Sequence, residues 1–172
     1  MSQSNAYLWG PLTVFGLSVA AIAGLLDQAS KLYLLFVHDL GANPVRLGPY
    51  LDFVLARNTG FSYGLFQSEG ALGRWVLLGF KALAVAVLWI WLARAENRLA
   101  ALSLGLIIGG AIGNAIDRLA HGWVVDFVYF HIQTADWRFN WYVFNLADVA
   151  IVAGVIGLLY ESLVGVRAAK AP

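Results

Sequence analysis

Carboxylate, amide and guanidinium side chains recur inside stretches of sequence that are otherwise apolar. Placing such a group at mid-membrane costs about 2.5–3.5 kcal/mol, so each one is a candidate for function. Asn114 and Arg118 are four residues apart, and Asn145 and Asp148 are three apart. A helical conformation therefore places each pair on one face, which can point into a helical bundle.

A pair of carboxylates suits these residues chemically. Two carboxyl groups held about 3 Å apart share one proton, because both cannot ionise easily. One member can then activate a water molecule while the other protonates the departing amine of a peptide bond. Asp148 comes seven residues after Trp141, which we expect to place it roughly 10 Å below the outer end of the last apolar stretch. Asp126 lies in the preceding loop, which can fold back over it.

Other hydrolytic chemistries lack the residues that they need. His38, His121 and His131 form neither a His-x-x-x-His pair nor an H-E-x-x-H motif, so zinc hydrolysis has no ligand set. No G-x-S-x-G run supports a serine nucleophile. The chain has no cysteine, which excludes a thiol nucleophile and thiolate metal ligands. The sequence predicts neither a metal nor a cofactor.

The composition is that of a membrane protein. Of 172 residues, 60% are apolar and 12% are charged, whereas soluble domains have about 45–50% and about 25%. A helix needs about 20 apolar residues to cross the hydrocarbon core, and lipid leaves helix as the only plausible state for such a segment. Four stretches meet this length: residues 7–26, 75–93, 99–116 and 141–160. A net charge of +1 provides no basic field for nucleic acid.

Positive charges orient these predicted spans. The hinge from Arg94 to Arg98 and the tail with Arg167 and Lys170 lie on one side, which the positive-inside rule makes cytoplasmic, together with both termini. Residues 38–69 and 121–140 are then the outer segments. Alternating apolar residues over 51–55, after the Gly48-Pro49 turn, predict extended structure there. The fold predicted for residues 1–172 is thus a single domain, all-α and polytopic, with four transmembrane helices and a small extended or β platform on the periplasmic side.

The residues alone leave other functions open. The polar set could be a buried network that ties helices together, with its carboxylates neutralised by Lys31 and Arg118. It could relay ions in a small carrier or proton-coupled channel, although no inverted repeat is visible. A non-catalytic scaffold that binds lipid or partner helices is a third alternative.

Five motifs in register carry a resemblance that covers essentially the whole chain. The chain resembles the lipoprotein signal peptidase family, bacterial aspartic proteases also called signal peptidase II. The matching motifs are Asp27-Gln-Ala-Ser-Lys31, Asn58-Thr-Gly60, Gly109-Gly-Ala-Ile-Gly-Asn114 running into Asp117-Arg118, Val125-Asp126-Phe127, and Phe144-Asn145-Leu-Ala-Asp148. The chain departs from the family at Phe61-Ser-Tyr63, where smaller residues are more usual, and this puts local loop packing in doubt.

The resemblance implies a function and a set of site residues. It implies cleavage of the signal peptide from prolipoproteins, on the amino side of a cysteine that carries diacylglycerol, with Asp126 and Asp148 as the catalytic pair. It implies that Asp27 and Asn58 support the outer rim, and the full supporting set is Asp27, Lys31, Asn58, Gly60, Asn114, Arg118 and Asn145. The implied partners are prolipoproteins, membrane lipids and globomycin-type inhibitors, without nucleic acid, at the bacterial inner membrane with the site facing the periplasm.

Overall fold

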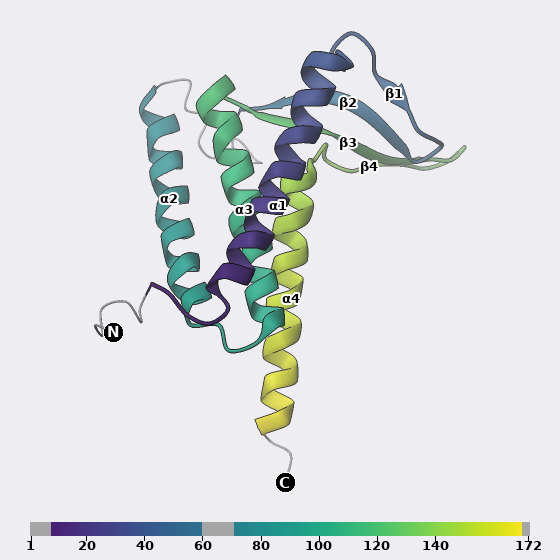
Figure 1. Ribbon diagram of the computed structural model, residues 1–172. Helices are drawn as coiled ribbons and strands as arrows, with labels where there is room; N and C mark the ends of the chain where they lie inside the picture. The colour runs from purple at the N-terminus through teal and green to yellow at the C-terminus, as the bar shows by residue number, and fades with distance from the viewer. Residues whose placement is uncertain (1–7, 60–70, 170–172) are drawn as a thin grey trace.

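The computed structural model describes residues 8–59 and 71–169. Long helices form a bundle, and a four-stranded antiparallel sheet lies across one end of it (Figure 1). The long helices are α1 (Thr13–Leu32), α2 (Ala71–Ala93), α3 (Arg98–His121) and α4 (Leu146–Ala169), and a π-helical turn, η2 (Tyr33–Val37), extends α1. The end of α1, the end of α3 and the start of α4 lie at the end of the bundle that carries the sheet (Figure 1). The bundle and the sheet together confirm the predicted combination of elements.

Three helices of the described residues are long and apolar enough to cross a membrane: Thr13–Val37, Arg98–His121 and Leu146–Leu163. In α2 the described residues include a shorter apolar helical stretch, Ala82–Ala93, and a fourth span stays a prediction. The helices have other limits than the predicted spans 7–26 and 141–160, since α1 begins at Thr13 and α4 at Leu146. Asp27 and Lys31 follow the predicted range 7–26 in the sequence, yet both lie inside α1, where they pair with each other.

Helix α3 occupies the centre of the bundle and packs closely on α1 through a stripe of glycines. A Cβ atom at Gly105 or Gly109 would meet backbone carbonyl oxygens of α1, and one at Gly113 would meet the carboxylate of Asp27. Such close approach is what small residues allow between membrane helices. The stripe therefore serves the packing of α3 on α1, and Gly113 additionally makes room for a polar side chain.

The sheet has the strand order β1-β2-β3-β4. Its strands are β1 (Val45–Arg46), β2 (Leu51–Asn58), β3 (Val124–Gln133) and β4 (Arg138–Asn140). The extended structure predicted near residues 51–55 is confirmed by β2. The loop predicted around Asp126 was wrong, because this residue lies in β3. Seven of the ten residues in β3 are β-branched or aromatic types with high strand propensity, and pairing with β2 orders them.

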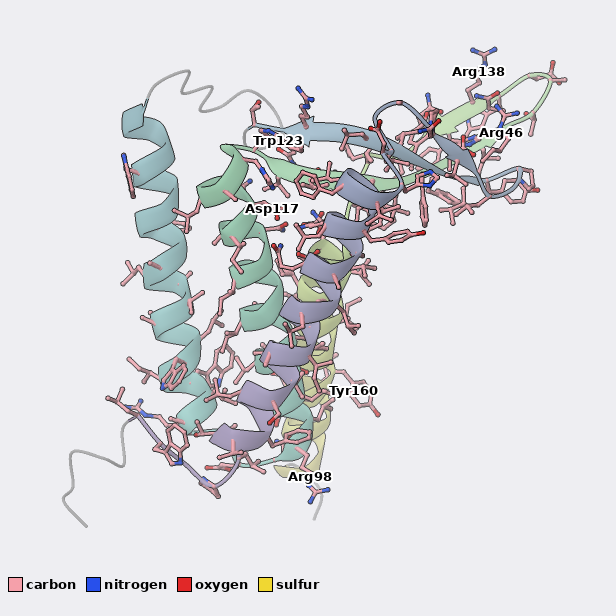
Figure 2. All side chains as sticks on the ribbon, turned by 45° about the horizontal axis from the view of Figure 1, so that its top comes forward. Arg46, Arg98, Asp117, Trp123, Arg138 and Tyr160 are labelled. Carbon is pink, nitrogen blue, oxygen red and sulfur yellow. The ribbon has the colours of Figure 1, made fainter. Side chains whose placement is uncertain are left out.

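An apolar cluster fixes the sheet to the end of α1. Leu34 of η2, Leu40 and Phe127 of β3 are buried together, and Phe53 of β2 packs edge-to-face on Phe127 with ring centroids 5.7 Å apart. The sheet extends sideways beyond the helices, and Figure 2 shows Arg46 near its free end. The cluster therefore holds the inner part of β3, where Asp126 lies, directly above the helix ends.

Candidate active site

Asp126 enters the site from the sheet. It pairs with Ala56 of β2, and Val128 pairs with Phe53. Between these two pairs β2 carries one residue more than β3, which is a β-bulge. The Asp126 side chain is on the buried side of the strand, and the residue is 2% exposed. Its carboxylate accepts hydrogen bonds from Asn58 Nδ2 at 3.0 Å and from Asn145 Nδ2 at 2.6 Å. Both donors are neutral amides, so the nearest partners of this carboxylate do not cancel its charge.

Asp148 enters the site from the start of α4. Phe144 is still extended and pairs with Val128 of β3, so α4 begins at Leu146 and Asp148 lies in its first turn. The predicted depth of roughly 10 Å assumed a helix that starts at Trp141, whereas α4 starts at Leu146. Asp148 is half-buried, which leaves it more accessible than Asp126.

Asn145 caps α4 in a reciprocal arrangement with Asp148. The Asn145 Oδ1 atom accepts the backbone N–H of Asp148 at 3.0 Å, and an Asp148 carboxylate oxygen accepts the backbone N–H of Asn145 at 3.1 Å. This is a capping box, which satisfies two otherwise unpaired N–H groups. The pair was expected on one helical face, whereas Asn145 precedes the helix, and this leaves its amide nitrogen free to reach Asp126.

Asn114 of α3 joins the two halves of the site. Its Nδ2 donates to Asp148 at 2.9 Å, and its Oδ1 accepts from Asn145 Nδ2 at 3.1 Å and from Lys31 Nζ at 3.0 Å. Asn114 and Asn145 are 6% and 0% exposed. Residues from α1, α3, α4 and β3 thus form one continuous hydrogen-bonded network around Asp126 and Asp148.

Beneath this network, Lys31 lies between two acidic residues. Its Nζ is 2.8 Å from an oxygen of Asp27 and 2.8 Å from one of Asp117. Asp27 was expected at the outer rim, but it is 0% exposed and belongs to the interior. Asp117 was missing from the predicted site set, as was Gln28, which donates to Asp117 at 2.9 Å. Their spacing could have signalled them, since Asp117 is three residues from Asn114 on the same helical face.

Arg118 and Asn58 complete the set that the structure describes. Arg118 is half-buried, its Nη1 donates to the backbone carbonyl of Asn114 at 3.2 Å, and it interacts electrostatically with Asp126 and Asp148. Gly60 lies outside the described residues. Figure 2 shows Asp117 at the end of the bundle that carries the sheet, whereas Arg98 lies at the opposite end. Among the described side chains, no group of three or more His, Asp or Glu residues is arranged to hold a metal ion.

The two carboxylates have different surroundings. The pKa of Asp126 is raised to about 6, mainly by burial and also by the charge of Asp148, while hydrogen bonds from Asn58 and Asn145 and the charge of Lys31 oppose the shift. Asp126 can therefore hold a proton near neutral pH, beside a second carboxylate that is more open to solvent. Such a pair can act as an acid and a base at the same time.

Comparisons with known proteins find relatives over most of the chain. A family model described as Signal peptidase (SPase) II matches residues 19–164. A lipoprotein signal peptidase of Nitrobacter hamburgensis is 62% identical over 156 residues, which are 90% of this chain and 95% of that protein. One from Rhodopseudomonas palustris is 56% identical over 160 residues, 91% of this chain and 96% of the relative.

Solved structures show the same fold. A structure described as a bacterial membrane enzyme superimposes with a TM-score of 0.69 at 24% identity, and the match covers 91% of this chain and 92% of the other. This likeness concerns the fold, since the identity is low. The family match, in contrast, covers most of the sequence and includes every described residue of the network. The chain therefore belongs to the signal peptidase II family of peptidases.

Proposed function

We propose that this chain is an aspartic endopeptidase that removes the signal peptide from prolipoproteins, with Asp126 and Asp148 as its catalytic pair. One observation carries the proposal: Asn145 donates to both carboxylates, through its side chain to Asp126 and through its backbone to Asp148. The shared donor is a neutral amide, and it keeps the two acidic groups close together. That is the arrangement that lets a pair hold one proton and hydrolyse a peptide bond with water.

The surroundings of the two groups support separate roles. Asp148 is the more accessible carboxylate, so it accepts a proton from water as the water oxygen attacks the scissile carbonyl carbon. Asp126 holds the shared proton and stabilises the oxygen of the tetrahedral intermediate through a hydrogen bond. When the carbon–nitrogen bond breaks, the proton held by the pair passes to the departing amine. The pair then returns to its initial state with one proton.

Arg118 is suited to hold the substrate. Its guanidinium is only half-buried at the mouth of the network, and a planar fork of N–H donors fits a peptide carbonyl. Asn114 keeps that arginine in place through its backbone carbonyl. We therefore assign Arg118 to the binding of the substrate backbone, with Asn58, Asn114 and Asn145 holding the pair and Gly60 in the adjoining segment.

The position of the site suits a substrate that arrives within the membrane. The pair lies where apolar helices meet the sheet, so a signal-peptide helix and a lipid on the following cysteine can approach sideways (Figure 1). The two relatives described above are lipoprotein signal peptidases by name. We infer cleavage on the amino side of a diacylglyceryl cysteine, inhibition by globomycin, and a location in the inner membrane. With α2 as a fourth span, both termini are cytoplasmic and the site faces the periplasm.

Purified protein incubated with a diacylglyceryl-modified prolipoprotein tests this function directly. The expected product is the precursor cut immediately before the modified cysteine, and globomycin should prevent its formation. A parallel reaction with the unlipidated precursor should run far more slowly, because each buried methylene contributes about 0.8 kcal/mol to binding. Absence of cleavage by folded protein would refute the proposed activity, whereas equal rates on the two precursors would refute only the recognition of lipid.

A further inference from the structure

Lys31, Asp27 and Asp117 form a triad of charges that the proposed chemistry does not use directly. The side chains of Lys31, Asp27 and Asp117 are 1%, 0% and 3% exposed. Lys31 and Asp27 belong to α1, and Asp117 belongs to α3. The structure therefore holds one ammonium and two carboxylates away from water at the junction of these helices.

Stability does not explain such a triad well. The loss of hydration commonly equals or exceeds the attraction between buried charges, and apolar replacements of similar volume are often as stable. The best-supported use of buried ionic groups is to select one arrangement among several. The contacts of the two carboxylates show which arrangement this triad selects.

Each carboxylate of the triad also binds the backbone. Asp117 Oδ2 accepts the N–H of Val125 at 3.0 Å, and Asp27 Oδ1 accepts the N–H of Ala147 at 2.9 Å. Val125 and Ala147 each directly precede one of the two proposed catalytic aspartates in the sequence. The triad therefore fixes β3 and α4 at the residue next to each reacting group.

Lys31 connects these two attachments and adds a third. Its remaining N–H donates to Asn114 Oδ1 at 3.0 Å, and Asn114 Nδ2 donates to Asp148. The three contacts occupy all three N–H donors of the ammonium group. A displacement of β3 relative to α4 would consequently break contacts of one buried cation.

We propose that Lys31 is a positioning residue, which sets the separation of Asp126 and Asp148 by tying Asp27 and Asp117 together. This inference rests on the proposed function for its catalytic consequence. The structural part of the inference is that the triad fixes the surroundings of Asp126, and it depends only on the hydrogen bonds described above. The polar and charged groups that face Asp126 are Asn58 from β2, Asn145 just before α4, Asp148 from α4, Arg118 from α3 and Lys31 from α1.

Two variants of Asp117 separate its attachments. Asp117→Asn keeps an oxygen for the Val125 N–H but loses the charge that pairs with Lys31 and the oxygen that accepts from Gln28. Asp117→Leu loses the oxygen for the Val125 N–H as well. We expect kcat to fall on the order of 10-fold in the first and on the order of 100-fold in the second, because small misplacements of reacting groups have effects of this size.

KM should stay within about threefold in both variants, since no contact to substrate is removed. Asp52→Asn is the matched control, because Asp52 is a partly buried acid that pairs with His131 on the sheet, away from the network. The Asp52→Asn variant should keep the wild-type kcat. Equal losses in the Asn and Leu variants, a loss expressed in KM, or wild-type kcat in folded Asp117→Leu would overturn the proposal.

A second measurement does not depend on cleavage. Infrared difference spectra recorded against pH show the protonated carboxyl of Asp126, identified as the band that Asp126→Asn lacks. In Lys31→Met the midpoint of this band should move to higher pH, because a nearby cation that favours the ionised form is lost. An unchanged midpoint in folded Lys31→Met would overturn the proposal. If wild-type protein does not cleave prolipoprotein, the proposed function fails, and the midpoint still tests whether the triad holds the surroundings of Asp126. If Lys31→Met does not fold, the two Asp117 variants test the positioning role of Lys31.

Discussion

The side-chain amide of Asn145 donates to the carboxylate of Asp126 across 2.6 Å, from the residue before α4 to the middle of the sheet. The same side chain accepts the N–H of Asp148, and so caps the helix that carries the second carboxylate. One asparagine therefore performs two tasks, which are helix capping and alignment of the proposed catalytic pair. These tasks can be separated by substitution.

Asn145→Ser and Asn145→Ala should lose activity alike but differ in stability. Serine can still cap α4, whereas alanine cannot, and that difference is worth about 1 kcal/mol. Both variants leave Asp126 without a hydrogen bond that contributes about 1.5–3 kcal/mol, so both should cleave prolipoprotein poorly. Thermal unfolding in detergent and the initial rate of cleavage measure the two effects. Wild-type cleavage by folded Asn145→Ser would show that the amide contact to Asp126 is dispensable.

The sequence predicted the helices and part of the platform because these elements have local signals. Long apolar stretches indicated the helices, and alternation at Leu51, Phe53 and Leu55 indicated β2. The strand around Asp126 has no such alternation, since apolar residues are continuous over residues 127–130. Its extended state depends on pairing with β2, which is distant in the sequence.

The start of α4 and the deeper part of the site were also beyond local reasoning. Residues 141–144 are as apolar as a helix would require, and only their pairing with β3 keeps them extended. Asp117 and Gln28 were visible as polar residues, but their role depends on the approach of α1 to α3. Motif spacing identifies which residues are unusual, whereas the tertiary contacts determine which of them share partners.

Gly113→Ala should disrupt the site from below. A Cβ atom at this position would lie 2.5 Å from the Asp27 carboxylate, which holds Lys31 and the N–H of Ala147. We expect a large fall in kcat together with lower thermal stability. Gly24→Ala is the control, because its Cβ would lie 3.5 Å from the nearest atom and alanine favours helix. If Gly113→Ala retained full activity, the close packing of α3 on Asp27 would not matter for function.

Labelling of single cysteines should establish the orientation. The chain has no native cysteine, so each introduced thiol is the only one present. Ala135→Cys, in the exposed turn between β3 and β4, should react with a membrane-impermeant reagent applied from the periplasmic side. Asn97→Cys, in the hinge before α3, should react only after the membrane has been permeabilised so that the reagent reaches the cytoplasmic side. The reverse pattern would place the site in the cytoplasm and contradict the proposed function.

The rate of cleavage should depend on pH through Asp126. Its pKa is raised to about 6 by burial, and the proposed mechanism needs its protonated form. The protonated fraction falls as pH rises through this value, so kcat/KM should decrease above about pH 6 and approach a tenfold loss per pH unit. Steady-state kinetics on one lipidated substrate from about pH 4.5 to about 8.5 would measure the break. A profile that stays flat up to pH 8 would rule out Asp126 as the proton donor.

Removal of either carboxylate of the pair should abolish turnover and leave the fold intact. Asparagine keeps the size of aspartate but cannot exchange a proton during hydrolysis, so Asp126→Asn and Asp148→Asn should both be inactive. Because the two groups act as a unit, the double variant should be scarcely worse than either single variant. Precursor cleavage and thermal unfolding in detergent are measured on the same preparations. Substantial cleavage by either folded variant would remove that residue from the pair.

Stability against pH gives the Asp126→Asn variant a signature of its own. The pKa of Asp126 is higher in the folded chain than its ordinary value of about 3.9. The folded state therefore binds more protons between about pH 4 and 6, and this group makes wild-type protein less stable as pH rises through that window, by about 3 kcal/mol in all. Asparagine does not titrate, so the variant should gain stability relative to wild type from pH 4 to 6, and the difference in stability should stay constant above pH 6.

A second effect of the substitution does not depend on pH. The new NH2 group faces an amide donor of Asn58 or Asn145, which lowers the stability of the variant at every pH without changing how the difference varies with pH. A difference in thermal unfolding temperature that does not change with pH would mean that the Asp126 carboxyl is not perturbed, and its assignment as the protonated member of the pair would fail.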